Sequence, residues 1–131
     1  MPFDGGEARI RRKHMLAKLD EVRRLLDTEE KWCKKHCRTW DGRYCFFAAV
    51  MAVRAEPVLY DLLLAAIQDV TGVAFKSIVR FNDQPATNHP LVLAVIEQAR
   101  SRILAGKIPV PVIRRGPLFA RTRRRGLSVE A

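Results

Sequence analysis

Long apolar runs are absent from this chain of 131 residues, and cysteine and histidine are scarce, with three residues of each. The longest uncharged apolar stretch, residues 44–53, is much shorter than the roughly 18 residues that a membrane-spanning helix needs. The first residues also lack the apolar centre of a secretory signal. We therefore expect a soluble, cytoplasmic protein that makes no membrane contact. Three cysteines is an odd number, and a reducing cytoplasm keeps thiols unpaired, so a disulfide framework is not expected either.

The chain has an excess of positive charge, with a formal net charge of +10 and a pI of about 10.3. This excess is unevenly distributed. Residues 46–106 carry five basic and five acidic side chains, whereas residues 107–131 carry seven basic side chains and one acidic. The distribution predicts a helical domain over residues 1–106 and a basic tail over residues 107–131. A basic arm on a neutral body is typical of proteins that bind a polyanion, most often a nucleic acid.

Helical periodicity dominates the predicted domain. The spacing of Met15, Leu19, Val22 and Leu26 places these residues on one face of a helix, predicted over residues 7–27. Further helices are expected over residues 29–38, 43–55, 57–71 and 87–105, with a short helix or turn between the last two. Together they predict an all-α fold, a compact bundle of about five helices.

The segment 43–55 differs from the other predicted helices because it is apolar on every side. This pattern is typical of a buried helix, so we expect it at the centre of the bundle. The tail, by contrast, has prolines at positions 109, 111 and 117, which exclude a continuous helix and favour an extended chain.

The order of certain residues resembles the pattern of a known family. The residues that carry the pattern are Trp32, Cys33, Gly42, Cys45, Ala49, Ala52, Phe81, Asn82, Asp83, Pro85, Thr87, Val92 and Ala99. Over about residues 16–104 the chain resembles a small domain family of bacteria and phages that is classified only as a domain of unknown function. Phe81 stands where the family has Trp, and Pro90 stands where an acidic residue would complete a capping box. The resemblance implies a compact helical domain and brings no activity with it.

A metal site is one interpretation of residues 32–45, which contain all three cysteines and His36. Zinc requires four cysteine, histidine or carboxylate ligands, so His36 or His89 would have to supply the fourth. However, the spacing C-x3-C-x7-C matches no common zinc motif, and on a helix His36 would point about 100° away from Cys37. We therefore predict no metal ion and no other cofactor. Cys33 and Cys45 are expected to be small buried side chains.

A reactive thiol at Cys45 is the catalytic alternative. Cys45 is expected near the start of helix 43–55 after a glycine turn, where the helix dipole favours a thiolate. As in papain-like hydrolases, His89 would act as the base and Asp83 would orient it. The residues after Cys45 are strongly apolar, which favours an inert buried thiol. Asn82 and Asp83 are more readily interpreted as a turn that caps helix 43–55 or the last long helix.

The functional prediction depends on the basic residues. Six arginines occur within residues 114–125, and a second basic group lies on the first predicted helix. The predicted nucleic-acid-binding residues are Arg114, Arg115, Arg121, Arg123, Arg124, Arg125, Arg11, Arg12 and Lys13. Guanidinium groups bind phosphates and stack on bases, and no base-reading recognition helix is evident. We expect a non-enzymatic protein that binds a nucleic acid or a ribonucleoprotein through its tail. The cysteine-dependent enzyme and a regulatory adaptor that binds an acidic protein partner remain as alternatives.

Overall fold

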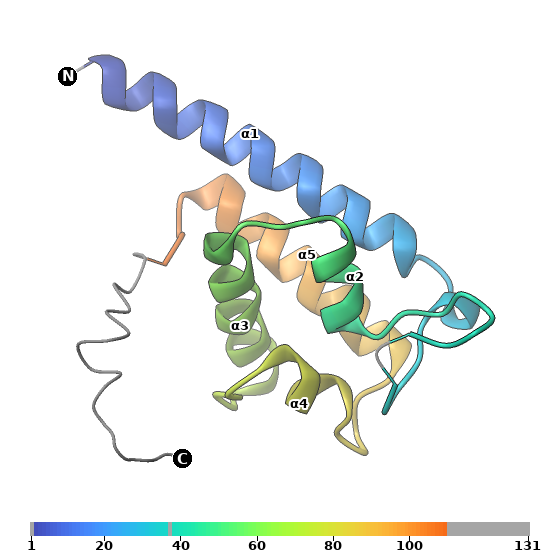
Figure 1. Ribbon diagram of the computed structural model, residues 1–131. Coiled ribbons are helices and arrows are strands. Elements are labelled where there is room, and N and C mark those ends of the chain that lie inside the picture. Colours follow the sequence, from blue (N-terminus) through green and yellow to red (C-terminus); the bar gives the residue numbers. More distant parts are fainter. Residues whose placement is uncertain (1, 37, 110–131) are drawn as a thin grey trace, which may run out of the picture.

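Five α-helices and one short 3₁₀ helix make up residues 2–36 and 38–109, the part of the chain that this computed structural model describes (Figure 1). The elements are α1 (Pro2–Leu25), η1 (Glu29–Lys31), α2 (Phe46–Ala52), α3 (Pro57–Thr71), α4 (Ile78–Asn82) and α5 (His89–Ala105). The all-α prediction is therefore confirmed. None of the helices in these residues has both the length and the apolar character of a membrane span. The predicted tail lies outside the described residues from Val110 onward, so its extended form stays a prediction.

Helix α5 makes the most extensive contacts of any helix in the described residues. It contacts both α3 and α1, and Figure 1 shows it between these two helices. Its apolar buried residues are Val92, Val95, Ile96, Ala99 and Ile103. Helices α2 and α4 contact each other, while α2 also contacts α1 and α4 also contacts α3. Because each buried aliphatic side chain contributes about 1.5–3 kcal/mol, these apolar faces determine the arrangement of the helices.

The helix predicted over residues 29–38 is wrong. Only Glu29–Lys31 is helical, as a single 3₁₀ turn, and the described residues after it form a loop. The backbone explains the difference: the Tyr44 N–H donates to the Lys31 carbonyl over 2.9 Å, and the Cys33 N–H donates to the Tyr44 carbonyl over 3.0 Å. Because these groups are paired across the loop, they cannot form the i to i−4 hydrogen bonds of a helix.

The prediction of a central helix over residues 43–55 is also wrong in extent and position. Helix α2 covers only Phe46–Ala52, with Cys45 as its N-cap. Past its C-terminal end, Arg54 has a φ of 57°, a conformation that helices do not continue through. Met51 is 57% exposed, because α2 contacts its neighbours through one side only. An apolar pattern on every side therefore did not identify the helix with the most extensive contacts, which is α5.

The ends of the two longest apolar helices follow local signals. Helix α3 covers the predicted residues, beginning at Pro57 and ending before Gly72, which has a φ of 77°. Helix α5 begins two residues later than predicted, because the Asn88 side chain accepts a hydrogen bond from the Leu91 N–H over 3.0 Å. Gly106 ends it with a φ of 75°.

Helices α3 and α5 are also joined by an ion pair. The Asp69 carboxylate accepts hydrogen bonds from Arg102, at 2.6 Å from Nε and 3.1 Å from Nη2, and from Gln98 at 2.9 Å. The bonds from Arg102 and then from Gln98 lower the pKa of Asp69, and the same pairing raises the pKa of Arg102. Solvent screens this pair, so we assign it less than about 1 kcal/mol of stability.

Candidate functional site

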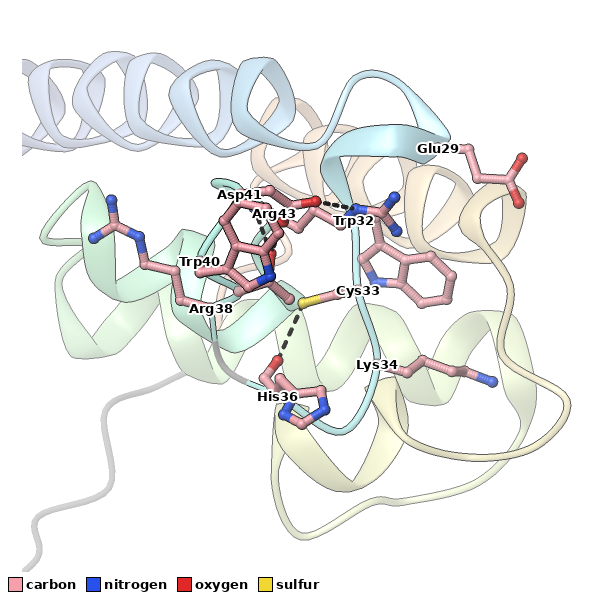
Figure 2. Close-up of a pocket in the computed structure, with 10 residues that line it drawn as sticks. Glu29, Trp32, Cys33, Lys34, His36, Arg38, Trp40, Asp41 and Arg43 are labelled. Carbon is pink, nitrogen blue, oxygen red and sulfur yellow. Dashed lines mark hydrogen bonds and ion pairs between the residues drawn. The ribbon is translucent and has the colours of Figure 1, made fainter.

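The loop between η1 and α2, residues 32–36 and 38–45, presents a tryptophan to solvent, and we call it the Trp40 loop (Figure 2). A tight turn forms its tip: the Thr39 N–H donates to the Arg43 carbonyl over 3.0 Å, and the Gly42 N–H donates to the Thr39 carbonyl over 3.1 Å. Gly42 has a φ of 92°, which strongly favours glycine there. The Thr39 hydroxyl also bonds the Asp41 carboxylate. At this tip Trp40 is 98% exposed.

Asn82, at the end of α4, holds the Trp40 loop against the bundle. Its side chain is fully buried. The Asn82 Oδ1 accepts hydrogen bonds from the Trp32 indole N–H over 2.7 Å and from the Phe46 N–H over 3.1 Å. The Asn82 Nδ2 donates to the Cys33 carbonyl over 3.1 Å and to the Asp83 carboxylate over 3.1 Å. The structural interpretation of this asparagine is therefore correct, since it caps α2 and also joins that helix to the loop.

A pocket of about 720 Å³ lies beneath the tip of the loop. Its lining residues are Glu29, Trp32, Cys33, Lys34, His36, Arg38, Thr39, Trp40, Asp41 and Arg43. In Figure 2 the side chains of Arg38 and Lys34 extend on opposite sides of the pocket. The hydrogen bond from Thr39, and then the charge of Arg43, lower the pKa of Asp41, so this carboxylate is charged and paired at neutral pH. The pocket therefore combines an exposed aromatic ring with cationic side chains.

The three residues of the thiol-enzyme alternative have separate structural partners. Cys45 is 3% exposed, and its sulfur accepts a hydrogen bond from the Ala48 N–H over 3.3 Å as the cap of α2. The His89 ring is hydrogen-bonded through Nε2 to the Leu26 carbonyl at 2.6 Å. The Asp83 carboxylate accepts from the Lys35 N–H over 2.8 Å. Within the described residues, His89 and Asp83 share no hydrogen bond, so the base and its orienting residue do not form a pair.

We expect Cys45 to resist alkylation in the folded protein, because its sulfur is buried and used as a helix cap. Iodoacetamide treatment followed by tryptic mass spectrometry measures this. Basic residues separate the three cysteines, so trypsin places each on a different peptide, and residues 44–54 carry Cys45 alone. This peptide should be labelled only after denaturation. Rapid labelling of native protein would restore the thiol-enzyme hypothesis.

The candidate metal ligands do not form a site in the described residues. No group of three or more His, Cys, Asp or Glu side chains there is placed to hold a metal ion. Cys37, one of the candidates considered, lies outside the described residues. His36 and His89 belong to different surroundings, since His36 lines the pocket of the Trp40 loop and the His89 ring bonds the Leu26 carbonyl.

The predicted basic residues of α1 form a segment that extends past the core. Burial along α1 begins at Met15, whereas Ala8 to Ile10 are exposed, so residues 8–14 are the basic segment of α1. Arg11 and Lys13 are exposed and Arg12 is partly buried. The last described residues, Ile108 and Pro109, line a pocket of about 480 Å³ together with Arg11, Arg12 and the acidic residue Glu56. The predicted arginines at 114–125 lie outside the described residues, but the chain leaves the bundle beside the basic segment.

The sequence analysis did not identify Trp40 as a functional candidate. Its signal was present, because a tryptophan stands between Arg38 and Arg43 immediately before an Asp-Gly turn. Tryptophan at a loop tip is unusual, since large aromatic side chains are mostly buried in folded proteins. The segment was instead interpreted as a possible metal site because of its cysteines and His36. A helix was predicted over 29–38, so no loop was expected there.

The fold and the loop held by Asn82 define a small all-α domain. The chain belongs to DUF6197, a family of unknown function, which matches residues 11–102. This match confirms the family resemblance and includes the Trp40 loop, Asn82 and most of α5. The arginines after Pro109 lie beyond it. No curated protein and no solved structure matches the chain.

Proposed function

We propose that this protein binds a nucleic acid, free or within a ribonucleoprotein, and that it acts by binding rather than by catalysis. The observation that carries the proposal is the position of Ile108 and Pro109 beside Arg11 and Arg12. The tail arginines and the basic segment of α1, which lie far apart in the sequence, therefore start from one region of the molecule. Two groups of cations at one place contact more phosphates than either group alone.

The basic segment of α1 is available for a polyanion. Among the carboxylates whose side chains the structure describes, none forms an ion pair with Arg11, Arg12 or Lys13. Other cations are less available, since Arg100 bonds Asp20 and Arg102 bonds Asp69. An unpaired surface guanidinium can bind a phosphate with two hydrogen bonds without first breaking an existing pair.

Chain length keeps the first tail arginines close to this segment. Arg114 is five residues beyond Pro109. An extended chain spans at most about 3.6 Å per residue, so the Cα atom of Arg114 lies within roughly 18 Å of the Cα atom of Pro109. That length allows one phosphate backbone to contact both cationic groups. Contacts of this kind position the protein on a nucleic acid without reading its sequence.

Removal of residues 110–131 is expected to lower the affinity for RNA and DNA oligonucleotides at least tenfold at moderate salt. Each phosphate contact contributes about 0.7–0.9 to the slope of log affinity against log salt concentration, so loss of six arginines should also make that slope shallower by several units. Fluorescence anisotropy of labelled oligonucleotides over a salt series measures both quantities.

Two charge variants test the contribution of α1 to nucleic-acid binding. The triple variant Arg11→Gln, Arg12→Gln and Lys13→Gln should weaken binding and reduce the slope by two to three phosphate contacts, or about 2 units. The matched control Arg54→Gln, Lys76→Gln and Arg80→Gln removes the same charge from the electrically neutral body and should have a smaller effect.

Unchanged affinity and slope after removal of the tail would contradict the proposal. A co-purifying acidic protein that survives nuclease treatment would favour the adaptor instead.

A further inference from the structure

We propose that the Trp40 loop is a stacking site for an unpaired base, so that the nucleic acid bound by this protein is single-stranded at that point. This inference rests on the proposed nucleic-acid binding and specifies the form of the strand. The basic segment of α1 and the tail supply phosphate contacts, which do not distinguish single strands from duplexes. The Trp40 indole supplies a contact that distinguishes single strands from duplexes.

The exposure of Trp40 is the first observation. Its indole is 98% exposed, whereas Trp32, the other tryptophan of the chain, is 8% exposed and hydrogen-bonded to Asn82. An exposed indole offers a large apolar face that a flat partner can cover. Nucleobases stack on such rings regardless of their identity, because every base has an aromatic face.

The hydrogen bonding of the loop is the second observation. The turn at its tip is closed by backbone hydrogen bonds between Thr39, Gly42 and Arg43, and the Arg43 N–H also donates to the Thr39 hydroxyl over 3.0 Å. Asn82 holds the base of the loop through the Trp32 indole and the Cys33 carbonyl. A loop whose backbone is already hydrogen-bonded loses less conformational entropy when a ligand binds.

The cations around the pocket are the third observation. The Arg38 guanidinium lies over the Tyr44 ring at 5.1 Å from its centroid, and the Lys34 ammonium lies 5.9 Å from the centroid of the Trp32 ring. These two cations extend on opposite sides of the pocket (Figure 2). A base stacked on Trp40 would therefore have the Arg38 guanidinium on one side for a flanking phosphate. The Lys34 ammonium on the other side already donates to the Gln84 carbonyl over 2.7 Å. Asp41 is paired with Arg43, which compensates the negative charge closest to the tip.

The size and position of the site fit an unpaired nucleotide. The pocket of about 720 Å³ lies within the range of roughly 300–1,000 Å³ that is usual for small-molecule sites. In a duplex both faces of each base are already stacked on neighbouring pairs, so a single indole gains contact only with an unpaired base.

Figure 1 shows the Trp40 loop and the last described residues at opposite ends of α1. Effects of changes at two such distant regions on binding free energy should add.

Substitution Trp40→Ala is expected to weaken binding of an oligothymidine single strand about 5- to 160-fold, the range that corresponds to the loss of one stacked base. The matched control Trp40→Phe keeps an aromatic ring and should retain most of the affinity. The slope with salt should be unchanged in both variants, because neither removes a cation. Because the Trp40 ring is almost fully exposed, neither variant should lower the melting temperature.

Tryptophan fluorescence provides an independent readout. Bound oligothymidine should quench the emission of the unaltered protein, whereas Trp40→Phe, which keeps only the buried Trp32, should show little quenching. A blunt DNA duplex of the same length as the oligothymidine should bind without quenching the tryptophan emission.

Three outcomes would overturn the stacking site. If Trp40→Ala binds oligothymidine as tightly as the unaltered protein while loss of the tail still weakens binding, the stacking site is wrong and the proposed function stands. Equal quenching by the duplex would reject the preference for single strands. If the full chain binds no RNA or DNA at any salt concentration, the proposed function and the stacking site both fail.

Discussion

Replacement of Asn82 by alanine is expected to lower the free energy of unfolding by about 2–4 kcal/mol. The reason is the number of buried groups that this one side chain satisfies. Without it, the Trp32 indole N–H, the Phe46 N–H and the Cys33 carbonyl lose their partner in a buried site. Each buried polar group left unsatisfied costs about 1–3 kcal/mol, and partial entry of water reduces the total.

The matched control for Asn82→Ala is Asn88→Ala. Asn88 is also an asparagine that caps a helix, but it is exposed and its side chain accepts a single hydrogen bond, from the Leu91 N–H. Its replacement should cost only about 1 kcal/mol. Urea denaturation followed by circular dichroism measures both variants. Equal midpoints for the two would mean that Asn82 acts only as a cap and does not hold the Trp40 loop.

Replacement of Phe46 by alanine is expected to lower the free energy of unfolding by about 3–5 kcal/mol. Phe46 is fully buried and packs edge-on against Phe81, with ring centroids 6.3 Å apart. Phe81 in turn packs against Phe75 at 5.7 Å, so removal of the first ring leaves a cavity beside two others. Helix α2 has seven residues, too few to be stable without tertiary packing, and therefore depends on this contact.

Two control variants separate cavity formation from the loss of an aromatic residue in general. Phe46→Leu keeps most of the buried volume and should cost less than about 1.5 kcal/mol. Phe47→Ala removes the next phenylalanine, which is only partly buried and packs on Tyr60 at 6.1 Å, so its effect should be clearly smaller than that of Phe46→Ala. Similar losses for Phe46→Ala and Phe47→Ala in chemical denaturation would show that α2 is not anchored through Phe46.

Local signals in the sequence predicted the long helices well and the region around Cys33 poorly. Pro57, Gly72 and Gly106 act on their own helix, and the structure places helix ends beside all three. The cysteine-rich segment has no such local determinant. Its conformation depends on Asn82, which bonds Trp32 across 50 positions of the sequence. A spacing pattern contains no information about a partner at that distance.

The candidate site likewise has features that the sequence predicted and features that only the structure revealed. Charge distribution predicted a basic tail and the basic residues Arg11 and Arg12, because charge is a property of composition. That the chain leaves the bundle beside Arg11 and Arg12 required the structure, since α5 must run back along α1 to bring Pro109 there. Trp40 was visible in the sequence, but its almost complete exposure became evident only when the helix predicted over 29–38 proved to be a loop.

By itself, the sequence determined that this protein is helical, that α3 and α5 occupy their stretches of the chain, and that positive charge gathers toward the C-terminal end. These features follow from apolar periodicity, capping residues and composition, which act over a few neighbouring residues. Tertiary structure decided that α5 packs against both α3 and α1, that α2 is short, and that a tryptophan is exposed at the tip of a hydrogen-bonded loop. Those outcomes depend on hydrogen bonds and packing between residues distant in the sequence, such as Asn82 with Trp32 and Phe46, and no local pattern specifies them.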